Sequence, residues 1–166
     1  MIENCFSVTQ PKQGHLLKIL PKQEISWKMS FEMEAFELNT GWTNVVQFID
    51  SGTTTDSIIS PGARTPAIFL RGSEIYFCFN TDASPNTFYS HYFPLNQNIE
   101  YVIEQVLVSP SQNPTIRVWV DGQNVYERTH NSRTPFFDVR CYISSPWMAS
   151  SRVYISNFEY KNFKIE

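Results

Sequence analysis

The chain has few charged residues and lacks a long apolar run. Only 17% of its 166 residues are charged, and the formal net charge is −3. Because domains that bind nucleic acid are typically basic, this composition argues against a nucleic-acid partner. No segment approaches the roughly 20 consecutive apolar residues that a membrane-spanning helix needs, so membrane insertion is not expected.

Cysteine is also scarce. Cys5, Cys78 and Cys141 make an odd count, and none of them stands in a C-x-x-C pair. They predict neither a zinc site nor a complete disulfide framework, and their redox state stays open. Cys141 alternates with apolar neighbours and Cys78 lies in the run IYFCF, so both are interpreted as small buried hydrophobic residues. Cys5 lies outside any clear strand.

Helical periodicity is absent as well, and a period of two residues dominates. Apolar side chains from Trp27 to Ala35 alternate with polar ones, which is typical of a strand that has one face in a core. Further strands are predicted near residues 15–20, 43–50, 66–71, 75–80, 98–108, 115–120, 123–129, 136–144 and 152–163. About ten or more strands without a helix predict an all-β protein, a two-sheet antiparallel jelly-roll sandwich formed by a single domain over residues 1–166.

The last third of the chain has the most specific pattern. The segment TIRVWVDGQNVYE forms a hairpin around Asp121-Gly122, and the segments FFDVRCYISSPW and SRVYISNFEY follow it. Together with WKMSFEMEAFE, GWTNVVQFIDSG, GARTPAIFL and LNQNIEYVIEQ, these segments resemble a laminin-G-like module of the concanavalin A-like lectin and glucanase superfamily. The resemblance covers roughly residues 24–163.

This resemblance implies a curved two-sheet sandwich, but it leaves function open. Members of the superfamily bind glycans, bind extracellular proteins or hydrolyse polysaccharides. We therefore expect an extracellular protein of cell adhesion or matrix. The N-terminal segment MIENCFSVTQPKQG lacks the apolar stretch of a signal peptide, so the chain is expected to be a domain excised from a larger secreted protein.

Five residues are predicted to bind the ligand. Strand alternation directs Arg117 and Trp119 to solvent, and it does the same for Arg140 and Tyr142. Trp147 adds an aromatic ring to a Pro-Trp turn at one end of the sandwich. Aromatic rings stack on the apolar faces of sugars, and arginine offers paired donors to hydroxyls or carboxylates. The alternative for each is ordinary packing under a loop or against a neighbouring strand.

The resemblance makes calcium a candidate cofactor, because related modules often hold it at the rim of the sandwich. Asp50 and Asp56 flank the segment SGTTT and are the oxygen-rich candidates. The sequence shows no EF-hand spacing and no acidic cluster. Solvated Asp residues at a strand end are the alternative interpretation.

An enzymatic alternative is based on Glu32, Glu34 and Glu37. Glucanases of the laminarinase type carry an E-x-D-x-x-E strand, and this chain reads E-M-E-A-F-E. A retaining glycosidase needs two carboxyl groups roughly 5 Å apart. Glu37 would join Glu32 on one face only if a bulge near Ala35 or Phe36 added a residue to the strand.

The sequence thus favours a non-enzymatic recognition module. Its predicted ligand is a glycan, slightly preferred, or an extracellular protein. The alternative is a small polysaccharide hydrolase that uses Glu32 and Glu37. Edge strands of such sandwiches often pair between subunits, so a homodimer is a further candidate.

Overall fold

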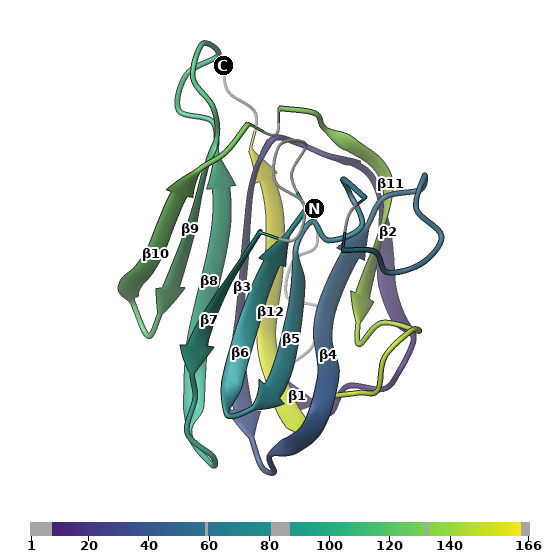
Figure 1. The fold of residues 1–166 in the computed structure, drawn as a ribbon, viewed down its shortest axis with the longest axis vertical. Coiled ribbons are helices and arrows are strands. Elements are labelled where there is room, and N and C mark those ends of the chain that lie inside the picture. Colours follow the sequence, from purple (N-terminus) through teal and green to yellow (C-terminus); the bar gives the residue numbers. More distant parts are fainter. Residues whose placement is uncertain (1–7, 59, 81–86, 132, 164–166) are drawn as a thin grey trace.

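A computed structural model describes residues 8–58, 60–80, 87–131 and 133–163, and these form two antiparallel six-stranded sheets (Figure 1). The described residues contain no helix, which confirms the all-β sandwich expected from the sequence. None of them therefore forms a helix that is long and apolar enough to cross a membrane.

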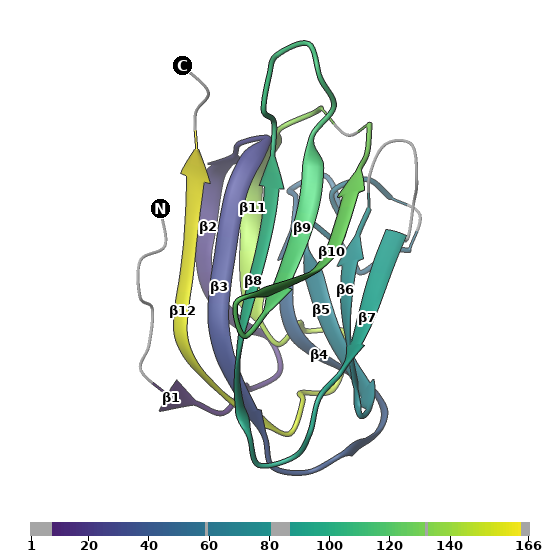
Figure 2. The same ribbon diagram turned by 90° about the vertical axis from the view of Figure 1, so that its left-hand side faces the viewer.

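The strands of the first sheet, which we call sheet I, run in the order β1-β12-β3-β8-β9-β10 (Figure 2). Their bounds are β1 Val8–Thr9, β12 Val153–Phe163, β3 Ser26–Ala35, β8 Asn98–Val106, β9 Thr115–Val120 and β10 Gln123–Thr129. Sheet II has the order β2-β11-β4-β5-β6-β7. Its bounds are β2 His15–Gln23, β11 Phe136–Ile143, β4 Asn39–Ile49, β5 Ala67–Gly72, β6 Glu74–Phe79 and β7 Thr87–Tyr92.

The core lies between the two sheets and is built from aromatic rings. Phe48 on β4 contacts Tyr160 on β12, with ring centroids 5.0 Å apart, and Phe77 on β6 contacts Tyr101 on β8 at 5.8 Å. The alternating apolar residues of β3 point into the same core and are at most 1% exposed. The alternation seen in the sequence therefore predicted the inner face of sheet I correctly.

The structure also contains strands that the sequence pattern did not predict. The segment 87–92 forms β7, and Val8–Thr9 forms the short β1. β7 was missed because its aromatic residues point to both faces: Phe88 is exposed, while Tyr89 stacks on Phe77 at 6.3 Å. The inward direction of Cys141 is confirmed, since Cys141 belongs to the core cluster with Val139 and Ile143.

The outer strands of the two sheets differ in how well they resist pairing with another chain. β1 has two residues, β10 carries charged residues, and β2 carries Pro21 between Leu20 and Lys22. Lysine, proline and shortness all disfavour edge-to-edge pairing. β7 has the sequence TFYSHY, which contains no lysine, arginine, acid or proline. A homodimer remains a prediction, and β7 is the edge best suited to form one.

Candidate functional site

The outer face of sheet II carries a second apolar cluster, separate from the core. An antiparallel sheet that buries one face on a core usually presents a polar opposite face. Here Ala67 and Phe69 of β5 and Cys78 of β6 form a buried group on that opposite face, with Tyr76 and Met148 packed against it. Such an apolar outer face is a recognised mark of a binding surface.

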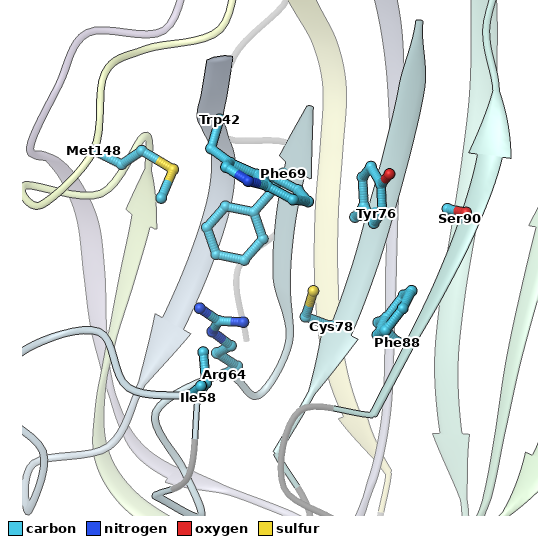
Figure 3. Close-up of a pocket in the computed structure, with 9 residues that line it drawn as sticks. All are labelled: Trp42, Ile58, Arg64, Phe69, Tyr76, Cys78, Phe88, Ser90 and Met148. Atoms are coloured by element: carbon cyan, nitrogen blue, oxygen red, sulfur yellow. The ribbon is translucent and has the colours of Figure 1, made fainter. Parts of the chain in front are cut away.

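A hollow of about 530 Å³ opens over this cluster (Figure 3). This volume falls within the range typical of small-molecule sites, roughly 300–1,000 Å³. Four neighbouring strands and two loops supply the walls. The lining residues are Trp42, Ile58, Arg64, Phe69, Tyr76, Cys78, Phe88, Ser90 and Met148.

A band of aromatic rings crosses the hollow from β4 to β7. The ring of Trp42 lies edge-on to Tyr76, with centroids 4.7 Å apart, and edge-on to Phe69 at 6.4 Å. Tyr76 in turn lies 6.0 Å from Phe88. Trp42 is 43% exposed and Phe88 is 53% exposed, so this band offers apolar ring surface to a ligand.

Arg64 and Asp56 form a paired wall at one side of the hollow. Arg64 donates through Nε to Oδ1 of Asp56 and through Nη2 to Oδ2, each at 2.9 Å. Its guanidinium also lies 4.8 Å from the centroid of Phe69. Burial alone lowers the pKa of Arg64, but the hydrogen bonds and charge of Asp56 outweigh it and the pKa is raised. Arg64 therefore stays charged, with its charge compensated within the protein.

The connection between β4 and β5, residues 50–66, is tied to the sheet at several points. Gln47 of β4 donates to Asp56 Oδ1 at 2.8 Å and to the carbonyl of Ala63 at 3.0 Å. Arg140 of β11 donates to the carbonyls of Asp50 and Thr53. These side-chain bonds replace the backbone ladder that a loop lacks, so this wall of the hollow is held in place.

Gly62 allows this connection to fold tightly against its own start. Its φ is +83°, and a Cβ at this position would lie 2.8 Å from Asp50 Cγ and 2.9 Å from the ring of Phe136. Both the dihedral angle and the contacts exclude an ordinary side chain. The glycine is thus a local sequence requirement of the loop that carries Arg64.

Cys78 lies at the floor of the hollow and is a free thiol, 4% exposed. Burial raises the pKa of Cys78 to about 12, although the nearby Arg64 opposes the shift. Because the thiolate is the reactive form, we expect Cys78 in native protein to react very slowly with a maleimide at pH 8. The rate should rise about tenfold per pH unit towards pH 11 while the fold persists.

This prediction can be measured in a Cys5→Ser variant by mass spectrometry of labelled peptides. Cys141, which is 0% exposed in the core, serves as the internal control that requires unfolding. Labelling of Cys78 at pH 8 as fast as that of a thiol in urea-unfolded protein would contradict the buried position.

The five residues predicted to bind ligand are divided between the two outer faces. Arg117 and Trp119 lie on β9 of sheet I, while Arg140 and Tyr142 lie on β11 of sheet II, and Trp147 follows β11. Their outward direction agrees with the alternation of β9 and β11, because the intervening side chains lie in the core cluster. The hollow itself is lined by a different set of residues.

The structure gives the contacts of the residues that were predicted to bind the ligand. Arg117 donates to Glu127 at 2.8 Å and to Glu104 at 3.4 Å, so it forms an ion-pair network along sheet I. The hydrogen bond to Glu127 is the main reason why the pKa of Arg117 is raised, and the negative charges of Glu127 and Glu104 add to this effect. Tyr142 lies edge-on to Trp147 with centroids 5.8 Å apart, and the structure brings these two together.

Asp50 and Asp56 both accept hydrogen bonds from side chains of the protein, Asp50 from Thr53 at 2.6 Å. The described residues contain no group of three or more His, Cys, Asp or Glu side chains that could hold a metal ion. Both oxygens of Asp56 accept hydrogen bonds from Arg64, and Oδ1 also accepts one from Gln47. A cation at the same oxygens would face a guanidinium, which like charge disfavours.

Glu32 and Glu37 have separate partners. Glu32 accepts hydrogen bonds from Asn98, at 2.8 Å, and from Asn157. Glu37 lies beyond the end of β3, where its side chain is 59% exposed and forms an ion pair with Arg152 at 3.4 Å. The pairing of β3 with β12 does contain an irregularity, between Ser156 and Glu159 of β12, and not near the end of β3.

Sequence reasoning missed the aromatic band of the hollow. A usable signal was present, because AIFL in β5 and IYFCF in β6 are apolar at consecutive positions. Such runs predict strands buried on both faces, and sheet II then needs a cover on its outer face. Trp42 and Phe88 gave no comparable signal. Each stands after polar residues and before a segment that mixes polar and apolar residues, so no apolar run marks its position.

No family model matches this chain, and no curated protein matches it. Solved structures do match. The ligand-binding domain of botulinum neurotoxin serotype D in complex with N-acetylneuraminic acid is 8% identical, with a TM-score of 0.57 over 85% of this chain and 34% of that one. The chain shares the β-sandwich fold of this domain.

Two enzymes have similar structures. A mutant of Trypanosoma rangeli sialidase displaying trans-sialidase activity is 16% identical, with a TM-score of 0.56 over 85% of this chain and 21% of that one. The endo-β-1,4-glucuronan lyase of the fungus Trichoderma reesei is 9% identical, with a TM-score of 0.57 over 97% of this chain and 79% of that one. The chain spans about a third of the matched toxin domain, and at these identities the likeness concerns the fold alone.

Proposed function

We propose that this chain is a non-enzymatic carbohydrate-recognition domain that binds a sugar in the hollow on the outer face of sheet II. The observation that carries this proposal is the band of exposed rings formed by Trp42, Tyr76 and Phe88 across a sheet face that would otherwise be polar. Of the two ligand classes predicted from the sequence, a glycan or a protein, this band of rings favours a glycan.

The chemistry of the hollow suits a sugar ring. Carbohydrate C–H groups pack on aromatic faces, while the hydroxyls around the ring need donors and acceptors at the edge. Ser90 and the phenol of Tyr76 supply such groups beside the rings. Ser90 and Tyr76 lie on strands β7 and β6, and the Arg64–Asp56 pair fixes the loop wall beside them, so little of the site has to become ordered when a ligand binds.

The fold likeness is consistent with this proposal. One similar structure holds N-acetylneuraminic acid, and two others are a sialidase and a glucuronan lyase. Recognition without catalysis is favoured because Glu32 and Glu37 have different partners and neither lines the hollow. An extracellular setting in adhesion or matrix is part of the same proposal.

The test is a titration of the purified domain with a panel of oligosaccharides, followed by calorimetry. We expect Trp42→Ala to weaken binding at least tenfold, which corresponds to about 1.4 kcal/mol. Trp119→Ala is the matched control, because Trp119 lies on the outer face of sheet I, far from the hollow, and should leave the affinity unchanged.

The opposite pattern would contradict the placement of the site. If Trp119→Ala or Trp147→Ala abolished sugar binding and Trp42→Ala did not, the binding surface would be the one first predicted from strand alternation. If no sugar bound and a protein ligand bound to the Trp42 face instead, carbohydrate recognition itself would be excluded.

A further inference from the structure

We infer that the sugar recognised by this hollow is acidic, and that its carboxylate is bound by Arg71 beside Trp42. This inference rests on the proposed function, because it assigns a chemical class to the ligand of the same site. It is supported by a second hollow, by an arginine that forms no ion pair within the described part of the chain, and by a buried amide that borders this second hollow.

A polar hollow of about 420 Å³ adjoins the aromatic one. Arg71, Ser73 and Glu74 line it, together with Asn39 and with Tyr76, which also lines the aromatic hollow. Arg71 follows Phe69 by two residues on β5, so both side chains lie on the outer face of sheet II. A ligand whose ring rests on the aromatic band can therefore extend a substituent into the polar hollow.

Arg71 is available to bind an anion. Its guanidinium lies 5.3 Å from the centroid of Trp42, and among the described residues it forms no ion pair with a carboxylate. A cation–π contact leaves the N–H donors of the guanidinium unpaired. Arg64, in the neighbouring wall, donates through Nε and Nη2 to the carboxylate of Asp56, so its charge is already compensated.

Asn39 borders the same hollow with a buried side-chain amide. The residue is 7% exposed, and its Oδ1 accepts the backbone N–H of Arg152 at 3.2 Å, which fixes the orientation of the amide. Its Nδ2 is buried and has no hydrogen-bond partner among the described residues. A buried donor without an acceptor is unfavourable, and Asn39 is one of the residues that border this hollow.

Glu74 sets the direction from which the carboxylate approaches. Its backbone lies opposite that of Arg71 in the register of β5 and β6, and its carboxylate accepts a hydrogen bond from the hydroxyl of Tyr76 at 2.7 Å. That hydrogen bond is the main reason why the pKa of Tyr76 is raised. Because Glu74 would repel a second carboxylate, the ligand anion is placed on the Trp42 side of Arg71.

The experiment compares acidic sugars with neutral counterparts of the same size. The probes are oligoglucuronate and oligogalacturonate with their carboxyl-reduced forms, and sialyllactose with lactose, each titrated into the full chain by calorimetry. We expect at least one acidic probe to bind at least tenfold more tightly than its neutral counterpart, and the preference to shrink between 50 and 500 mM salt.

Two charge variants are expected to change the affinity for the acidic probe in opposite directions. Arg71→Gln should weaken the acidic probe about tenfold and leave the neutral one unchanged, since only the acidic probe uses the charge. Glu74→Gln keeps an acceptor for Tyr76 but removes the repulsion, so it should strengthen binding of the acidic probe about two- to threefold. Both side chains lie at exposed positions, and the thermal midpoints of the two variants should match that of the parent.

The outcomes separate the inference from the proposed function. Equal binding of acidic and neutral probes, both lost in Trp42→Ala, would overturn the acidic preference and leave carbohydrate recognition intact. An acidic preference unchanged in Arg71→Gln would overturn the role of Arg71. Absence of binding by every probe would overturn both the acidic preference and the proposed function. A cooperative thermal unfolding transition would show that the protein in this experiment was folded.

Discussion

Replacing Asp56 with alanine is expected to lower the free energy of unfolding by about 3 kcal/mol, because it leaves a buried guanidinium without its counter-charge. The side chains of Arg64 and Asp56 are only 10% and 17% exposed, so little water can replace the lost carboxylate. Asp56→Ala also removes the acceptor of Gln47 on β4. The measurement is equilibrium unfolding in urea, followed by tryptophan fluorescence and circular dichroism.

Glu159→Ala is the matched control for this loss of an acid. Glu159 lies on the exposed face of β12, and its removal should change stability by less than about 0.5 kcal/mol. The double variant Asp56→Leu with Arg64→Met should recover most of the lost stability, since it removes the stranded charge as well. If Asp56→Ala were no more costly than Glu159→Ala, the pair would be too well solvated to support the wall of the hollow.

Phe48→Ala is expected to destabilise the fold by about 3–5 kcal/mol, the range for a large aromatic residue removed from a core. Phe48 is 0% exposed and lies where β4 of sheet II meets β12 of sheet I, in contact with Phe158 and Tyr160. The cavity left by its ring would be shared by both sheets. Thermal and urea unfolding of the variant provide the measurement.

Phe88→Ala is the control of the same residue type. Phe88 is 53% exposed at the hollow, so its loss should cost less than about 1 kcal/mol in stability while weakening sugar binding. The two phenylalanines thus separate folding from recognition. If Phe88→Ala destabilised the protein as much as Phe48→Ala, the outer cluster would be a second core and not a binding surface.

Much of the fold could be predicted because each inner strand obeys a local rule. The alternation in β3 and the Asp121-Gly122 turn between β9 and β10 need only neighbouring residues to be recognised. β7 could not be predicted in this way. It lies at an edge, where Phe88 covers the outer face and Tyr89 stacks on Tyr126 of the opposite sheet at 4.9 Å, so both faces are aromatic.

The candidate site was less predictable because it depends on contacts between distant segments. Alternation showed correctly that Arg140 points outward, but its hydrogen bonds go to the carbonyls of Asp50 and Thr53, which no local pattern reveals. In the same way, the sequence suggested Asp56 as an oxygen ligand of calcium, whereas in the structure its carboxylate forms an ion pair with Arg64. The assignment of such side chains requires knowing which loop folds over which strand.

The anchored connection between β4 and β5 has a consequence for the kinetics of recognition. Its ties to Gln47 and Arg140 are hydrogen bonds between groups of the protein itself, so we expect that no ordering of this wall has to accompany association. Rapid mixing should therefore show a single phase whose rate rises linearly with sugar concentration, without the plateau that a preceding conformational step imposes. Differences in affinity among sugars would then arise from their dissociation rates.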